Sequence, residues 1–109
     1  MARDRADVLR IVREFREHLR ALDGERLKRA YLYGSHARGD AREDSDIDVA
    51  VVLEGPVKAR EEGKRTIGLV SDLSLRENCL LMPLFISEDD YRTRSEAIHR
   101  SIAREGTPA

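Results

Sequence analysis

Two aspartates separated by one residue stand at the head of the most strand-like run of the chain. Asp46 and Asp48 flank Ile47, and an almost continuous apolar run continues to Leu53. Alternation along a strand places both carboxylates on one face. Carboxylates about 4 Å apart repel by about 4 kcal/mol at an effective dielectric near 20. A cation between them relieves this repulsion, and oxygen ligands favour Mg²⁺ or Mn²⁺ over zinc. The alternative is a polar strand edge on which Asp48 caps a turn.

A glycine and a serine precede these acids, where a predicted strand at 27–33 gives way to a short helix. Gly34 allows the backbone to approach a ligand closely, and Ser35 is a good N-cap for one or two helical turns before Gly39. A helix N-terminus offers unpaired N–H groups and a favourable dipole to an anion, so this turn suits a phosphate. Taken alone, such a segment is more often an ordinary glycine turn with a serine cap.

The two halves together resemble a known signature. The sequence runs Gly34-Ser35-His36-Ala37-Arg38-Gly39, five residues, then Ser45-Asp46-Ile47-Asp48. This pattern is similar to the motif of the DNA polymerase beta nucleotidyltransferase superfamily, and the length and layout resemble its small minimal nucleotidyltransferase (MNT) proteins.

The resemblance implies a mixed sheet flanked by helices and a site for a nucleoside triphosphate. It places Gly34 and Ser35 on the phosphates and makes Asp46 and Asp48 ligands of a divalent metal, Mg²⁺ or Mn²⁺. We add Ser45 and Arg38 as candidate nucleotide contacts. The implied reaction moves a nucleoside monophosphate, AMP from ATP, to a hydroxyl acceptor and releases pyrophosphate.

Active members of the superfamily usually carry a third carboxylate on a later strand, which orients or deprotonates the attacking hydroxyl. The matching strand is expected at 79–86, which contains no acid. Glu77, just before it, is our first candidate, and the acids just after it are the others: Glu88, Asp89 and Asp90. Without a third acid, the metal and nucleotide can still bind while transfer is slow or absent. A catalytically weak nucleotide-binding or partner-masking module is therefore the alternative function.

The neighbours of the motif have less specific interpretations. We expect His36 to face solvent and Arg38 and Arg42 to flank the phosphate turn. Tyr31 and Tyr33 are expected to pack on the sheet, and Cys79 to be a small buried side chain.

Composition limits the class of protein. The chain has 109 residues, of which 40% are hydrophobic, 5% aromatic and 38% charged, so we expect one domain, 1–109, with an aliphatic core. The net charge of −1 argues against a general nucleic-acid-binding surface. One cysteine allows no internal disulfide. No apolar run approaches the ~18 residues of a membrane span, and no secretory signal precedes the domain, so a cytoplasmic location is expected.

Hydrophobic periodicity predicts the elements that position these residues. Three- and four-residue apolar steps indicate helices at 7–22 and 58–76, and another helix is expected at 95–105. Strands are expected at 27–33, 47–53 and 79–86, the last at a sheet edge because it contains Pro83. The fold class is α+β or α/β, with a small mixed sheet of at least three strands packed by helices.

The size of the chain and the resemblance together point to partners. Small MNT proteins are commonly paired with HEPN-domain toxins, so the implied acceptor is a hydroxyl of such a toxin, for example a tyrosine. A homodimer is a further expectation from the small core. A third function, nucleotide sensing or oligomerisation through an exposed strand edge, also stays open.

Overall fold

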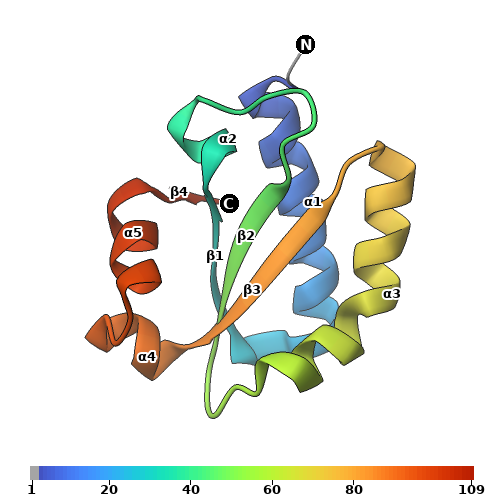
Figure 1. Ribbon diagram of the computed structural model, residues 1–109. Helices are drawn as coiled ribbons and strands as arrows, with labels where there is room; N and C mark the ends of the chain where they lie inside the picture. The colour runs from blue at the N-terminus through green and yellow to red at the C-terminus, as the bar shows by residue number, and fades with distance from the viewer. Residues whose placement is uncertain (1–2) are drawn as a thin grey trace.

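The computed structural model describes residues 3–109, which form a four-stranded sheet with helices on both faces (Figure 1). The helices are α1 (Arg5–Asp23), α2 (Ser35–Arg38), α3 (Ala59–Glu77), α4 (Glu88–Thr93) and α5 (Ala97–Glu105), and a 3-10 turn spans Gly24–Arg26. The strands are β1 (Leu27–Tyr33), β2 (Ile47–Leu53), β3 (Leu81–Ser87) and β4 (Thr107–Pro108). The predicted α+β class with a mixed sheet is confirmed. No helix within 3–109 has the length and apolarity needed to cross a membrane.

The sheet has the order β3-β2-β1-β4. β1 pairs antiparallel with β2 and β4, whereas β2 pairs parallel with β3. β1 and β2 begin and end at the predicted residues. β3 begins at Leu81 and not at Cys79, because Asn78 takes a left-handed conformation and the Cys79 N–H still bonds to the Ser74 carbonyl at 3.0 Å. β4 was not predicted, since two residues carry no periodic pattern.

Pro83 lies on an edge strand, as predicted, and its position explains how that edge is protected. The Leu80 carbonyl accepts from the Ile47 N–H at 2.8 Å, so backbone groups of even-numbered β3 residues face β2 and those of odd-numbered residues face outward. The outward N–H of Leu81 donates to the Ser74 hydroxyl at 3.1 Å. Pro83 has no N–H to offer. The open edge therefore presents few donors to another strand.

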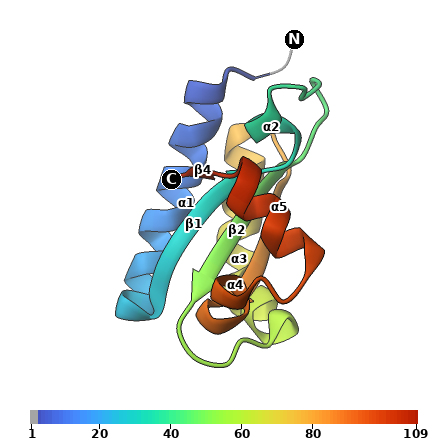
Figure 2. The same ribbon diagram turned by 90° about the vertical axis from the view of Figure 1, so that its left-hand side faces the viewer.

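The two faces of the sheet have different covers. α1 and α3 pack on one face, where buried α1 side chains meet odd-numbered β2 residues such as Val49 and Val51. α4 and α5 lie on the other face, and Figure 2 shows them in front of the sheet with α3 behind it. There Ile102 of α5 packs with Ala50 and Ile86, next to Tyr31 and Tyr33. Even-numbered β2 positions, which include Asp48, thus belong to the α4/α5 face.

Local signals mark where the helices begin and end. The Asp4 side chain accepts from the Ala6 N–H and caps α1, and Gly24 ends it. Ser87 caps α4 by accepting from Asp90. The last helix begins at Ala97 and not at the predicted Ser95, because Glu96 and His99 cap it reciprocally.

Candidate functional site

The turn between β1 and α2 holds Asp48 against its backbone. Tyr33 is the β1 partner of Asp48, so Gly34 lies directly beside that aspartate. Gly34 has φ 76°, in the left-handed region that favours glycine. A Cβ built at this position would overlap the Asp48 carboxylate. The glycine of the motif is therefore required by close approach as well as by backbone conformation.

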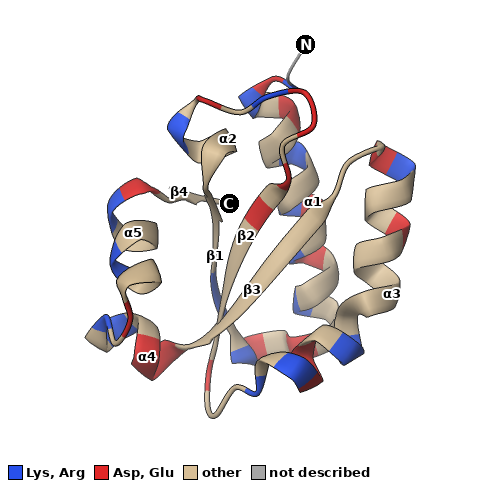
Figure 3. Cartoon of the chain, viewed as in Figure 1, with Lys and Arg blue, Asp and Glu red and all other residues tan. Residues whose placement is uncertain are grey.

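The two aspartates lie together as predicted. Asp48 is half-buried, while Asp46 is exposed just before β2. Figure 3 shows acidic residues in the loop before β2 and in the first part of that strand. Burial raises the pKa of the Asp48 carboxyl, and the negative charge of Asp46 raises it further. His36 and Arg38 act on the same pKa in the opposite direction. The pair is thus a site where negative charge is costly and a cation would lower the energy.

The fit to a divalent cation can be judged from the contacts of the two carboxylates. Among residues 3–109, neither Asp46 nor Asp48 takes part in a hydrogen bond or ion pair within the chain. Their oxygens remain available as ligands, and oxygen is the donor that Mg²⁺ prefers. The two side chains therefore suit a magnesium or manganese ion that takes its other ligands from nucleotide and water.

His36 is buried at 7% exposure, so the prediction that it faces solvent is wrong. Its Nε2 lies 3.4 Å from the Ser45 carbonyl oxygen and links α2 to the loop before Asp46. The Ser45 hydroxyl accepts from the Arg42 N–H at 2.7 Å. Both side chains hold the loop that delivers Asp46. The sequence alone did not reveal this, because the burial depends on how the loop folds back over α2.

Arg38 lies on the exposed side of α2 and is shared between two acids. Its Nε is 3.3 Å from Asp40, and its Nη1 is 3.7 Å from Glu105 at the end of α5. The side chain is 46% exposed, so both pairs are weak and the guanidinium is free to exchange partners. No motif or periodicity in the sequence links Glu105 to this turn.

The neighbour of Asp48 on β3 is Met82, which is 44% exposed. Leu84, two residues further along the same face, is also apolar. The strand position beside the aspartates thus carries no acid. Within residues 3–109 no group of three His, Cys, Asp or Glu side chains is placed to hold a metal ion.

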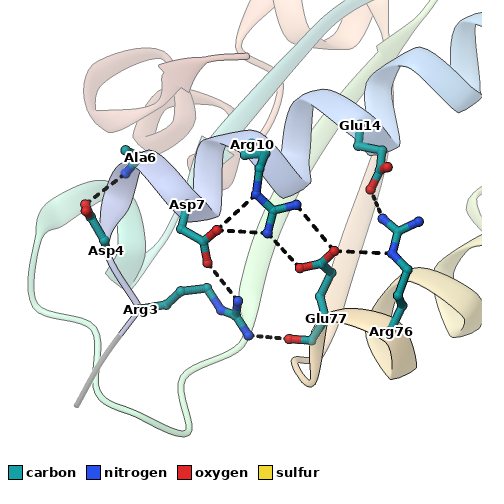
Figure 4. A network of polar contacts seen from close by, with 8 residues as sticks. All are labelled: Arg3, Asp4, Ala6, Asp7, Arg10, Glu14, Arg76 and Glu77. Carbon is teal, nitrogen blue, oxygen red and sulfur yellow. Dashed lines mark hydrogen bonds and ion pairs between the residues drawn. The ribbon is translucent and has the colours of Figure 1, made fainter.

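Glu77, our first candidate for a third carboxylate, points away from the aspartates. It ends α3 on the α1/α3 face and accepts from Arg10 at 2.7 Å and from Arg76 at 3.2 Å (Figure 4). Arg10, foremost, and Arg76 hold the pKa of Glu77 below its usual range. Arg3 donates to its backbone carbonyl. The structure therefore gives Glu77 a place in the contact between α1 and α3, not beside Asp46 and Asp48.

A polar cavity of about 310 Å³ lies on the other side of the loop. Its lining includes Arg3, His36, Ser45 and Ile47, but neither Asp46 nor Asp48. Arg5 also reaches this region, where its guanidinium donates to the Ala37 carbonyl. Arg5 therefore supports α2 by this bond, a role that no local pattern predicts.

The family model for nucleotidyltransferase domains matches residues 12–103. The chain belongs to this nucleotidyltransferase family. Two Methanocaldococcus jannaschii proteins, each named "Putative protein adenylyltransferase", are 31% identical to it. One match covers 72% of this chain and 78% of the relative, and the other covers 87% and 90%. As a member of the family, the chain is a nucleotidyltransferase by its relationships.

Solved structures share the fold. A "putative nucleotidyltransferase from Sulfolobus solfataricus" has a TM-score of 0.65 at 21% identity, over 95% of this chain and 80% of that one. A "toxin-antitoxin with AMP-PNP" has a TM-score of 0.60 at 17% identity, over 97% and 72% of the two chains. A mutant of the toxin–antitoxin MntA-HpeT has a TM-score of 0.58 at 15% identity, over 97% and 72%. At these identities the similarity shows that this chain and the three solved chains share one fold.

Proposed function

We propose that this protein transfers AMP from ATP to a hydroxyl acceptor, with Mg²⁺ or Mn²⁺ held by Asp46 and Asp48. The observation that carries the proposal is the placement of these two carboxylates beside the Gly34 turn, with no partner of their own within residues 3–109. In the reaction, the acceptor hydroxyl gives its proton to water, its oxygen bonds to the α-phosphorus, the bond from that phosphorus to the leaving oxygen breaks, and pyrophosphate departs.

The residues of the chain divide the work of binding. Gly34 and Ser35 present backbone and hydroxyl groups to the phosphates, and Arg38 exchanges its weak contacts with Asp40 and Glu105 for a phosphate oxygen. We retain Ser45 as a nucleotide contact, next to its role in the loop. A bound divalent ion would supply charge neutralisation of the triphosphate and a lower pKa for the attacking hydroxyl.

The acceptor that we propose is a hydroxyl of a partner protein, a tyrosine of a HEPN-type toxin, which makes this chain antitoxin-like. The proposal is supported by the fold shared with toxin–antitoxin chains and by relatives named for protein adenylylation. The exposed Met82 beside Asp48 leaves this corner open to another molecule. A homodimer and a location in the cytoplasm, where ATP is abundant, complete the proposal.

A second function is favoured by one specific observation, the apolar Met82 at the position where a third acid would lie. In that version the chain binds nucleotide or masks a toxin surface and transfers AMP slowly or not at all. The two versions differ in whether neutralisation of the partner requires Asp46 and Asp48.

Incubation of the protein with labelled ATP, Mg²⁺ and candidate acceptors tests the reaction directly. We expect Asp46→Asn and Asp48→Asn to reduce label transfer at least a hundredfold without unfolding the domain. Asp44→Asn, which removes an exposed acid of the same loop, is the matched control and should leave transfer within twofold. Transfer that survives in both aspartate variants would refute the assignment of the metal ligands.

Co-expression with the partner separates the two versions. The enzymatic version loses rescue of the host in Asp46→Asn and Asp48→Asn. The masking version keeps it.

A further inference from the structure

Helix α4 lies at the end of the sheet away from α2 (Figure 1). A second charged cavity lies beside α4, on the α4/α5 face. It has a volume of about 320 Å³ and is lined by Arg29 and Tyr31 of β1, Val52 of β2, Glu88, Tyr91 and Arg92 of α4, and Arg94. Arg29 pairs with Val52 in the register, whereas Asp48 pairs with Tyr33 four residues further along β1. At ~3.3 Å per strand residue the two places are about 13 Å apart. Ile102 of α5 packs on Ala50 between them, so the cavity is separate from the aspartate site.

Two stacked tyrosines are among the residues that line this cavity. The rings of Tyr31 and Tyr91 lie 5.5 Å apart at an angle of 29°. The Arg94 guanidinium lies 4.8 Å from the centre of the Tyr91 ring, a cation–π contact. Arg94 reaches this position from a left-handed backbone with φ 56°, and its Nη1 donates to the Tyr91 carbonyl. Tyr91 therefore holds the Arg94 side chain in place at the cavity.

The charges of the lining are unbalanced. Three arginines face one carboxylate, that of Glu88. Within the described residues, 3–109, neither Arg29 nor Arg94 forms an ion pair. Arg92 pairs with Asp89 at 2.8 Å, but both side chains are more than 70% exposed, so this pair contributes little and exchanges readily. By contrast, the largely buried Glu62 is fully neutralised by Arg26 and Arg65.

We propose that this cavity, the Arg29–Arg94 pocket, binds the phosphate group of a small phosphorylated molecule. Guanidinium groups bind phosphate oxygens in pairs, and a dianionic phosphate matches the excess of arginines better than a single carboxylate does. Burial, and after it the hydrogen bond with Tyr31, raises the pKa of the Tyr91 phenol to about 12. Because Tyr31 and Arg94 already lie against the Tyr91 ring, recognition depends on charge and not on stacking of a base.

Titration calorimetry tests this pocket independently of the proposed reaction. The measurement uses the full chain with Asp46→Asn and Asp48→Asn, in EDTA, so that the aspartate site holds no metal. The probes are inorganic pyrophosphate, AMP and adenosine. We expect pyrophosphate to bind and adenosine to show no heat. Binding of AMP would extend the ligand class to nucleotides, whereas binding of adenosine as tight as that of AMP would overturn recognition through phosphate.

Paired variants locate the binding. Arg29→Gln with Arg94→Gln should weaken pyrophosphate binding at least tenfold. Arg13→Gln with Arg60→Gln removes the same charge from exposed helix positions and should change the dissociation constant less than twofold. Equal weakening by both pairs would reduce the effect to net charge and overturn the proposal.

Amide chemical shifts in the protein with native Arg29 and Arg94 provide a test that does not depend on folding of the variants. We expect the largest changes upon pyrophosphate addition at Tyr31, Tyr91 and Arg94. Changes confined to residues 34–48 would place the anion at the phosphate turn and refute the pocket.

Discussion

Single residues at the start of β2 decide whether the family motif forms a working site. Asp48 has its carboxylate against the Gly34 backbone, and its neighbour on β3 is a methionine. The site thus combines two neighbouring acids with an apolar side chain at the third corner. Substitution of Gly34 tests the contribution of close packing to the site, and substitution of Glu77 tests the contribution of a third carboxylate.

Gly34→Ala should abolish detectable Mg²⁺-dependent nucleotide binding, because the new Cβ overlaps the Asp48 carboxylate at φ 76°. The backbone strain alone costs about 1–2 kcal/mol of stability. Gly24→Ala is the matched control, since Gly24 has φ 56° and no atom within 4 Å of a built Cβ. Calorimetry and chemical denaturation measure both effects. Binding that is equally weak in the Gly24 variant would attribute the loss to stability, not to the site.

Glu77→Gln should leave AMP transfer within twofold of the unsubstituted protein, because Glu77 contacts Arg10 and Arg76 and not the aspartates. The expected change is a small decrease in Tm from a weaker contact between α1 and α3. The labelled-ATP assay and a thermal melt measure the two quantities on the same sample. A hundredfold loss of transfer at unchanged Tm would restore Glu77 to the reaction.

At the scale of elements, α3 depends on a buried carboxylate at its first turn. Glu62 is 5% exposed and accepts from Arg26 at 2.7 Å and from Arg65 at 2.6 Å. These donors, Arg26 foremost, lower the pKa of Glu62 in the folded protein. The folded state therefore binds this proton less readily than the unfolded chain does.

Glu62→Gln should destabilise the protein by about 1–2 kcal/mol at pH 7, since the arginines lose a charged acceptor. With a folded pKa below the unfolded one, the contribution of Glu62 is complete above the ordinary glutamate range and disappears as the pH falls through the lowered folded value. Urea denaturation at pH 7 and near pH 3 should thus show a difference between the two proteins that shrinks in acid. Glu61→Gln, at an exposed position next to it, serves as the control and should change little at either pH.

The edge of β3 gives a second prediction at this scale. Pro83 supplies no outward donor, and Ser74 occupies that of Leu81. Pro83→Thr with Ser74→Ala should expose two outward N–H groups and increase self-association, because unpaired edge donors recruit other strands. Light scattering over a range of protein concentrations measures this, and Thr66→Ser is a control that keeps its hydroxyl bond inside α3. An unchanged mass in the double variant would show that the edge is protected in another way.

For the whole molecule, the separation of the two sheet faces organises function. The α1/α3 face holds most of the buried core and the ion pairs around Glu77, while the α4/α5 face holds both candidate ligand sites. The aspartates lie at one end of the sheet and the Arg29–Arg94 pocket at the other. Helix α5 therefore lies between the two candidate ligand sites, on the face shown in front in Figure 2 (see also Figure 1).

Local sequence determined much of this protein. The strands β1 and β2, the cap of α4 and the position of Asp46 beside Asp48 follow from periodicity, turn chemistry and the two-residue repeat of a strand, all of which act over a few neighbouring residues. Pro83 indicated an edge strand for the same reason, since the missing N–H is a property of the residue itself.

Only the tertiary structure decided the features that depend on which segments meet. β4 forms because β1 offers it an open edge, and His36 is buried because the 40–46 loop folds over it. Glu77 comes just before the strand expected to lie beside the aspartates. In the structure it ends α3 on the α1/α3 face of the sheet, whereas Asp48 belongs to the opposite face. Asp48 is beside Met82 through parallel pairing of strands separated by a helix. The sequence names the chemical groups, whereas the packing of distant elements determines which of them share a site.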